Sequence, residues 1–354
     1  MSAETVKTNL KRPGDFKRRA VSVLAEGATE GLVEARLLQE ERSLPLLVQP
    51  QIAGVNLTAW ASKNRTLIAA RLAQHGAVLF RNFAAAVSEF EQFIRAVSGE
   101  TLEYADQSSP RTKVSGNVYT STDYPASQAI HLHNENSYSY AFPQKLFFAC
   151  VTAPAQGGET PIADSRKIYE RIAPAIRARF MEKQVKYVRN FGDGFGLDWR
   201  VVFQTGDRAT VEAYCRRNDI NCEWKDGDRL RTTQVRPAIV RHPATGEMVW
   251  FNHAVFFHIT TMDAAFQEAL LSDFAEEDLP SNTFYGDGTQ IEPEVLAALR
   301  EAYRQETVAF RWREGDVLMI DNLLTAHGRA PYGGERKIVV GMSELLTRAD
   351  FTVN

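Results

Sequence analysis

The sequence has little cysteine, no long apolar run and almost no net charge. Its three cysteines, Cys150, Cys215 and Cys222, are too few for a disulfide framework and lack the spacing of a zinc knuckle. No stretch approaches the roughly 18 apolar residues that a membrane helix requires, and the N-terminus has no apolar signal core. A net charge of −3 gives no general attraction to nucleic acid or to a membrane surface. These absences predict a cytoplasmic protein without a nucleic-acid or membrane partner.

The two ends of the chain differ from its middle in composition. Residues 1–50 are predicted to be an N-terminal arm and peripheral segment, with a short helix around Gly31–Glu41 and an extended stretch at Leu44–Pro50. Residues 51–345 have the composition of one large globular domain with helical insertions, and residues 346–354 form a C-terminal tail. The peripheral segment is a candidate surface for homo-oligomer contacts.

Short apolar runs separated by Gly, Pro, Asn and Asp are typical of strands, and they dominate the chain from about residue 110 onward. The predicted strands are Ala77–Arg81, Ile130–His133, Leu146–Thr152, Val185–Arg189, Pro237–Arg241, Met248–Asn252, Thr307–Trp312, Val317–Asp321 and Lys337–Met342. The predicted helices are Asn64–His75, Ser88–Val97, Ser165–Glu182, Asp207–Asn218, Met262–Glu277 and Glu292–Gln305. This mostly β pattern with flanking helices predicts a double-stranded β-helix, or jelly roll, as the core of a single domain.

Two imidazoles and one carboxylate stand out as metal-ligand candidates. Because alternate side chains of a strand point the same way, His133 and Glu135 can reach one ion from the end of one strand, and His327 follows another strand. Such a set caps one face of an octahedral iron(II) and leaves three positions open. The same period places His131 beside His133, so His131, His133 and His327 remain an alternative set. A zinc hydrolase on a similar barrel is a second alternative, although the chain has no His-Glu-x-x-His helix.

Further motifs accompany these ligand candidates. The segment Gly157–Asp164 carries Thr160, which lies 27 residues after His133, and both Arg329 and Arg336 follow His327. Together these segments resemble the TauD/TfdA-like family of iron(II)/2-oxoglutarate-dependent dioxygenases. The phrase His133-Asn134-Glu135-Asn136-Ser137-Tyr138 looks most like the SyrP-like branch, known from syringomycin biosynthesis.

The resemblance implies Fe(II), 2-oxoglutarate as co-substrate and O2. It implies iron ligands His133, Glu135 and His327, and so selects His133 over His131. It also implies that Thr160 and Arg336 bind the distal carboxylate of 2-oxoglutarate, which a guanidinium matches bidentately. Arg336 lies nine residues after His327, closer than the family's trailing arginine usually lies, so Arg329 is a competing anchor.

The reaction that the resemblance implies is oxidation of an unactivated C–H bond in specialised metabolism. The SyrP-like likeness points to an amino acid or close derivative, free or bound to a carrier protein. Related halogenases have a small residue where this chain has Glu135, so the carboxylate favours hydroxylation, with desaturation and epoxidation left open. Candidate substrate contacts are Arg111, Asn136, Ser137, Tyr138 and Asn252, and His253 and His258 are predicted to be packing or capping residues.

Overall fold

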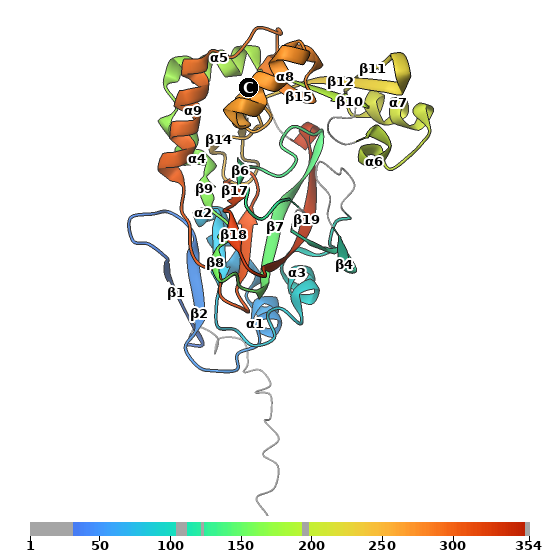
Figure 1. Ribbon diagram of the computed structural model, residues 1–354. Helices are drawn as coiled ribbons and strands as arrows, with labels where there is room; N and C mark the ends of the chain where they lie inside the picture. The colour runs from blue at the N-terminus through green and yellow to red at the C-terminus, as the bar shows by residue number, and fades with distance from the viewer. Residues whose placement is uncertain (1–30, 104–111, 122–123, 193–197, 351–354) are drawn as a thin grey trace, which may run out of the picture.

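The structure, a computed structural model, describes residues 31–103, 112–121, 124–192 and 198–350 (Figure 1). Its largest sheet has eight strands within these ranges. In spatial order they are β1 (Val33–Leu37), β2 (Leu46–Pro50), β3 (Ala77–Phe80), β16 (Val317–Asp321), β7 (Ala141–Thr152), β19 (Lys337–Thr347), β5 (Val118–Thr120) and β4 (Lys113–Ser115). The neighbours pair antiparallel except β2 and β3, which run parallel. Residues 1–30 of the predicted arm lie outside the described residues.

Both faces of the sheet are buried at its central strands, as β7 illustrates. Leu146 and Phe148 point to an inner apolar cluster, while Phe147 and Ala149 between them point to an outer one. This is the period of two expected of a strand that packs on both faces. The outer face is covered by α1 (Leu57–Lys63), α2 (Arg65–His75) and α3 (Phe90–Ser98). The central strands therefore form a rigid, fully packed support.

A smaller sheet faces the inner side of the large one. It contains β6 (Ile130–His133), β17 (Thr325–Arg329) and β9 (Ile162–Asp164), all antiparallel. A short pair, β8 (Gln156–Gly157) with β18 (Tyr332–Gly333), lies next to it in sequence. Ile162 belongs to the same inner cluster as Phe148 and Val340, so the two sheets share one core. The mostly β, double-stranded β-helix prediction is confirmed.

The remaining elements gather at one end of the molecule, as Figure 1 shows. A four-stranded sheet there contains, in spatial order, β11 (Asn221–Lys225), β12 (Arg229–Arg236), β10 (Val185–Phe191) and β15 (Ser281–Tyr285), and β13 (Ile239–Arg241) pairs with β14 (Met248–Trp250). The helices are α4 (Ser165–Arg171), α5 (Pro174–Lys183), α6 (Trp199–Phe203), α7 (Arg208–Arg217), α8 (Ala264–Asp273) and α9 (Pro293–Glu306). Short 3-10 turns are η1 (Asp226–Asp228), η2 (Ile259–Thr261), η3 (Glu276–Asp278) and η4 (Arg348–Asp350).

Three local predictions were wrong. The segment Gly31–Glu41 is not a helix, because its residues 33–37 pair with β2 and the pairing overrides their helix propensity. The segment Thr307–Trp312 is not a strand; only Val308 forms a bridge, to Ile162. The helix predicted at Ser165–Glu182 is two helices, because Pro174 begins α5 and cannot continue α4.

The first and last strands of the described chain both join the large sheet. β1 and β2 lie at one edge of it, and Leu46 and Leu47 of β2 are buried. β19 continues to Thr347. The predicted domain limits at residues 50 and 345 stay predictions.

Candidate metal centre

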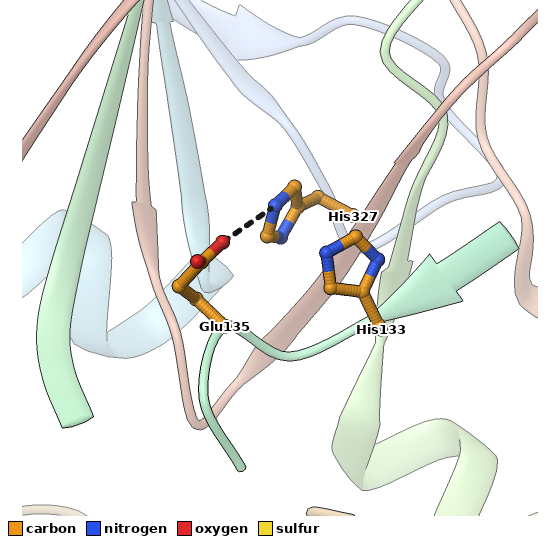
Figure 2. Close-up of side chains that lie close together, drawn as sticks. All are labelled: His133, Glu135 and His327. Atoms are coloured by element: carbon orange, nitrogen blue, oxygen red, sulfur yellow. Dashed lines mark ion pairs between the residues drawn. The ribbon is translucent and has the colours of Figure 1, made fainter. Parts of the chain in front are cut away.

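The three ligand candidates converge at the junction of β6 and β17. His133 ends β6, Glu135 follows it in the turn, and His327 lies in the middle of β17, where it is the register partner of His133. Their ligand atoms all lie within 4.8 Å of one another. His327 Nε2 lies 3.7 Å from Glu135 Oε2, the contact drawn in Figure 2. Glu135 and His327 are only 3% and 5% exposed.

Neighbouring polar groups fix the orientation of these side chains. His133 Nδ1 lies 2.8 Å from the His131 carbonyl oxygen, so Nδ1 carries the proton and Nε2 keeps its lone pair for an ion. Asn322 holds the turn from the opposite side: its Oδ1 accepts the Glu135 N–H at 2.7 Å, and its Nδ2 donates to the Glu135 carbonyl at 2.9 Å. His131 itself is exposed and is not part of the cluster.

The donor set fits a ferrous ion. Two imidazole nitrogens and a carboxylate oxygen, without a thiolate, are the ligands of non-haem iron oxygenases, whereas structural zinc sites are closed by four ligands. The three donors come from one side of the site, because β6 and β17 are neighbouring strands. Phe148 of β7 packs against His327 with ring centroids 5.2 Å apart, which places apolar surface beside the ligands.

Thr160 and Arg336 lie together in the structure. The Thr160 hydroxyl accepts hydrogen bonds from Trp312 Nε1 at 3.1 Å and from Arg336 Nη2 at 3.4 Å. Arg336 also donates to the Gly158 carbonyl and to the Ser121 hydroxyl. Burial, and then the nearby Arg329, lower the pKa of Arg336 to about 10. A desolvated guanidinium without a carboxylate partner among the described residues is suited to bind a carboxylate ligand.

Gly157 and Gly158, just before Thr160, allow the backbone to pass close to Pro331 and Arg336. Gly157 has φ +65°, and a Cβ there would lie 2.2 Å from the Pro331 carbonyl oxygen. Gly158 has φ +69°, and a Cβ there would lie 3.0 Å from Arg336 Cδ. Side chains at these positions would therefore strain the turn and displace the arginine.

Arg329, the competing anchor, is occupied elsewhere. Its guanidinium donates to the carbonyl oxygens of Tyr124, Pro125 and Gln128 at 2.9, 2.7 and 2.9 Å. It also lies 5.3 Å from the ring centroid of Tyr332. These contacts give Arg329 a structural task, holding residues 124–128 against β17.

The candidate substrate residues divide into two groups. Asn136, Ser137 and Tyr138 are buried in the turn directly after Glu135, and the Ser137 hydroxyl lies 3.3 Å from His253 Nδ1. Asn252 is also buried, but its side chain bonds backbone, donating to the Ala238 carbonyl and accepting from the Ala254 N–H. Arg111 lies outside the described residues.

The sequence did not predict that His253 and Phe256 lie beside the metal ligand His133. His253 stacks on His133 with ring centroids 5.7 Å apart, and Phe256 lies 4.6 Å from His133. His253 also stacks on Phe257 at 4.8 Å, so the predicted packing role is present, and His258 caps η2. Burial, followed by His133 and two arginines, holds the pKa of His253 well below its usual range. The only sequence signal was an aromatic run around residues 250–257.

A comparison with protein families decides the affiliation. The model of the family described as "Taurine catabolism dioxygenase TauD, TfdA family" matches residues 40–342. The chain belongs to this family. It is 41% identical over 274 residues to the dapdiamide synthesis protein DdaC of Enterobacter agglomerans, covering 77% of this chain and 83% of DdaC. It is 29% identical over 322 residues to a clavaminate synthase-like protein of Arabidopsis thaliana, covering 86% and 94%.

Solved structures agree on the fold. PvcB of Pseudomonas aeruginosa superposes with a TM-score of 0.53 at 17% identity, over 91% of this chain and 93% of PvcB. A second PvcB structure is described as that of an Fe, alpha-ketoglutarate dependent oxygenase, at a TM-score of 0.53 and 16% identity. As a TauD/TfdA-family member, the protein is an iron(II)/2-oxoglutarate-dependent oxygenase that uses O2. Its place in the SyrP-like branch stays a prediction. No helix in the described ranges is long and apolar enough to cross a membrane.

Proposed function

We propose that this oxygenase hydroxylates an unactivated C–H bond of an amino acid or a close derivative, free or bound to a carrier protein. The observation that carries the proposal is the convergence of His133, Glu135 and His327 within 4.8 Å. Relatives named for the synthesis of small natural products, among them DdaC, support a small-molecule substrate in specialised metabolism. The choice of an amino acid rests on the resemblance to the SyrP-like branch. The proposed setting is the cytoplasm.

His133, Glu135 and His327 would hold the iron. Iron(II) held there would activate O2, the oxidant for C–H hydroxylation, with 2-oxoglutarate as the co-substrate. The chain contributes orientation: the His131 carbonyl fixes the tautomer of His133, and Asn322 fixes the backbone of Glu135. Because these supports are backbone and amide groups, they hold the ligands without adding charge.

Thr160 and Arg336 would bind the distal carboxylate of 2-oxoglutarate. The Thr160 hydroxyl is held by Trp312 Nε1, and the Arg336 guanidinium is fixed by the Gly158 carbonyl. Both groups are therefore oriented before the co-substrate arrives, which reduces the entropy lost on binding. Burial strengthens the charge–charge contact because little water competes for it.

Glu135 decides between two outcomes of the proposed chemistry. Its carboxylate is buried and points toward His327, as Figure 2 shows, so it occupies the position that a halide would need. Tyr138, His253 and Phe257 then form an aromatic wall beside His133 that excludes water and can position a substrate C–H bond. This arrangement favours hydroxylation over halogenation.

A two-part experiment tests the proposal. Anaerobic addition of Fe(II) and 2-oxoglutarate is expected to give a weak visible charge-transfer band that is absent in His133→Ala. A screen of amino acids and their carrier-bound thioesters should then identify a compound that stimulates succinate release and gains one oxygen by mass spectrometry. A product that has instead lost two hydrogens would show that the enzyme is a desaturase and not a hydroxylase. Absence of the band would remove the proposed iron centre.

A further inference from the structure

Arg189 packs on aromatic rings instead of pairing with a carboxylate. Its guanidinium lies 5.7 Å from the ring centroid of Tyr138, 5.0 Å from that of Phe191 and 5.9 Å from that of Phe257. No hydrogen bond or ion pair joins this guanidinium to another described residue. Tyr187, Arg189 and Phe191 alternate along β10, so all three face the same side of that strand.

A series of ring contacts connects this side of β10 to the metal centre. The ring of Tyr138 lies 5.2 Å from that of His253, and His253 stacks on His133 at 5.7 Å. The His253 N–H donates to the Tyr187 hydroxyl at 3.0 Å, which fixes the segment after β14 to β10. The hydrogen bonds of Thr160 and Arg336 go instead to Trp312, Gly158 and Ser121, so Arg189 belongs to a different part of the site from the 2-oxoglutarate anchor.

Arg348 adds a second positive charge to this region. It donates to the carbonyl oxygens of Ser137 and Ser139, and its buried Nη1 has no hydrogen-bond partner within the described ranges. A contrast is the buried Arg81, which pairs with Asp316 through contacts of 2.9 and 2.6 Å. Burying a cation without an anionic partner is costly, so an anion bound nearby would stabilise the Arg348 guanidinium beside Ser137.

His253 provides a third unsatisfied group. It is only 3% exposed, and its Nε2 has no partner among the residues that the structure describes. When Nδ1 accepts the Ser137 hydroxyl, Nε2 carries the proton and is a hydrogen-bond donor. A buried donor of this kind is stabilised by an acceptor from a ligand.

We propose that Arg189, with His253 beside it, binds an anionic group of the substrate, a carboxylate or a phosphate. The proposal rests on the oxygenase function proposed above and narrows its substrate to molecules that carry such a group. A guanidinium matches either anion bidentately, and the half-buried guanidinium of Arg189 lies beside the rings of Tyr138 and Phe257. Arg348 contributes long-range attraction while it holds the turn after Glu135.

Anion binding without turnover is the first test. The full chain, saturated with Mn(II) and the 2-oxoglutarate analogue N-oxalylglycine, is titrated with sulfate and with inorganic phosphate, and potassium chloride serves as the ionic-strength control. The melting temperature is expected to rise by about 2–4 °C. Arg189→Gln should abolish the rise, whereas Arg177→Gln, which removes a guanidinium 4.4 Å from the ring of Tyr169, should keep it.

Stability without the anion separates a binding role from a structural one. Arg189→Gln removes the three ring contacts but no hydrogen bond or ion pair to a described residue, so its melting temperature in chloride should fall by no more than about 3 °C. An equal rise in wild type and Arg189→Gln would overturn the proposal, as would no rise in the wild type. A larger fall for Arg189→Gln in chloride would show that the arginine is structural.

Turnover then identifies the anion. Each active amino acid is compared with its primary amide and with its phosphopantetheine thioester, in wild type and in Arg189→Gln. If the anion is a carboxylate, KM for the acid rises about 10–100-fold in the variant while KM for the amide and for 2-oxoglutarate does not. If it is a phosphate, only the thioester is affected. An equal loss for all substrates contradicts the proposal, whereas no succinate with any compound removes the proposed function and leaves the anion result standing.

Discussion

At the scale of single residues, His131 and His133 form a matched pair. The two imidazoles are separated by one residue, yet His133 belongs to the ligand cluster while His131 is exposed and contributes its backbone carbonyl. Removing a group that only supports a ligand already costs about 10–100-fold in metal affinity. His133→Ala should therefore lose more than about 100-fold in iron affinity and succinate release, and His131→Ala should retain both because its carbonyl remains. Equilibrium metal binding and succinate assays measure the outcome; equal losses in the two variants would reject the ligand assignment.

The two arginines after His327 have separable effects. Arg336→Gln removes a charged partner of a carboxylate, a contact worth about 1.5–3 kcal/mol, so KM for 2-oxoglutarate should rise by about 10–100-fold. Arg329→Gln removes hydrogen bonds to three backbone carbonyls. It should lower the free energy of unfolding by about 2 kcal/mol and leave that KM nearly unchanged. Urea unfolding and 2-oxoglutarate titrations of both variants measure this, and the reverse pattern would make Arg329 the anchor.

At the scale of elements, Asn322 links the turn after β6 to the end of β16. Its Nδ2 donates to the carbonyls of Glu135 and Pro143 at 2.9 and 2.8 Å, and its Oδ1 accepts the Glu135 N–H. Asn322→Asp keeps the shape but loses both donors and places a carboxylate against two carbonyls. We expect a loss of about 2–5 kcal/mol in stability and of about 10–100-fold in iron affinity.

Asn252→Asp is the matched control for this prediction. Asn252 is equally buried and also clamps backbone, but its bonds go to Ala238 and Ala254 and not to a ligand. This variant should lose stability while keeping iron affinity. Denaturant unfolding and metal titration compare the two, and a similar loss of iron affinity in both would show that Asn322 has no specific effect on the site.

The local sequence pattern was sufficient to predict some strands but not others. Ile130–His133 and Val317–Asp321 matched the strands β6 and β16, because short apolar runs between polar turns have few other solutions. The strand β17 was missed, since Thr-Ala-His-Gly-Arg is wholly buried and shows neither alternation nor an apolar run. Its pairing with β6 and β9 is a long-range property that no window of sequence contains.

The same limit applied to the site. The spacing of His133 and Glu135 follows from the period of a strand, but bringing His327 to them required the resemblance to a known family. Arg189 lies on β10 of the four-stranded sheet, and His253, in the segment after β14, is held to that strand by its hydrogen bond to Tyr187. Residues supplied by a separate sheet carry no local signature of their role.

At the scale of the whole molecule, two buried thiols make stability depend on alkaline pH. Burial raises the pKa of Cys150 and of Cys215 to about 12, whereas an unfolded thiol titrates near about 8.5. The folded protein therefore holds these protons more tightly. Their contribution to stability is complete below about pH 8.5 and declines toward pH 12, by about 1.4 kcal/mol per pH unit for each thiol.

Cysteine variants test this pH dependence. The double variant Cys150→Ala/Cys215→Ala should be less stable at pH 7, because it leaves cavities, but its free energy of unfolding should decline less steeply above pH 8.5. Cys222→Ala should flatten the profile less, since that thiol is only partly buried. Urea unfolding between pH 7 and pH 11 provides the slopes, and parallel profiles for wild type and double variant would show that these thiols do not contribute.

The direct register pairing of His133 with His327 has a consequence for assembly of the centre. Backbone hydrogen bonds between β6 and β17 set the separation of these imidazoles. The iron site is therefore formed as soon as the two strands pair, before any metal binds. Loading the metal should consequently leave the circular dichroism spectrum unchanged, unlike a zinc finger, which folds only around its ion. A shift of one residue in this ladder would turn His133 to the opposite face and erase the centre without unfolding the protein.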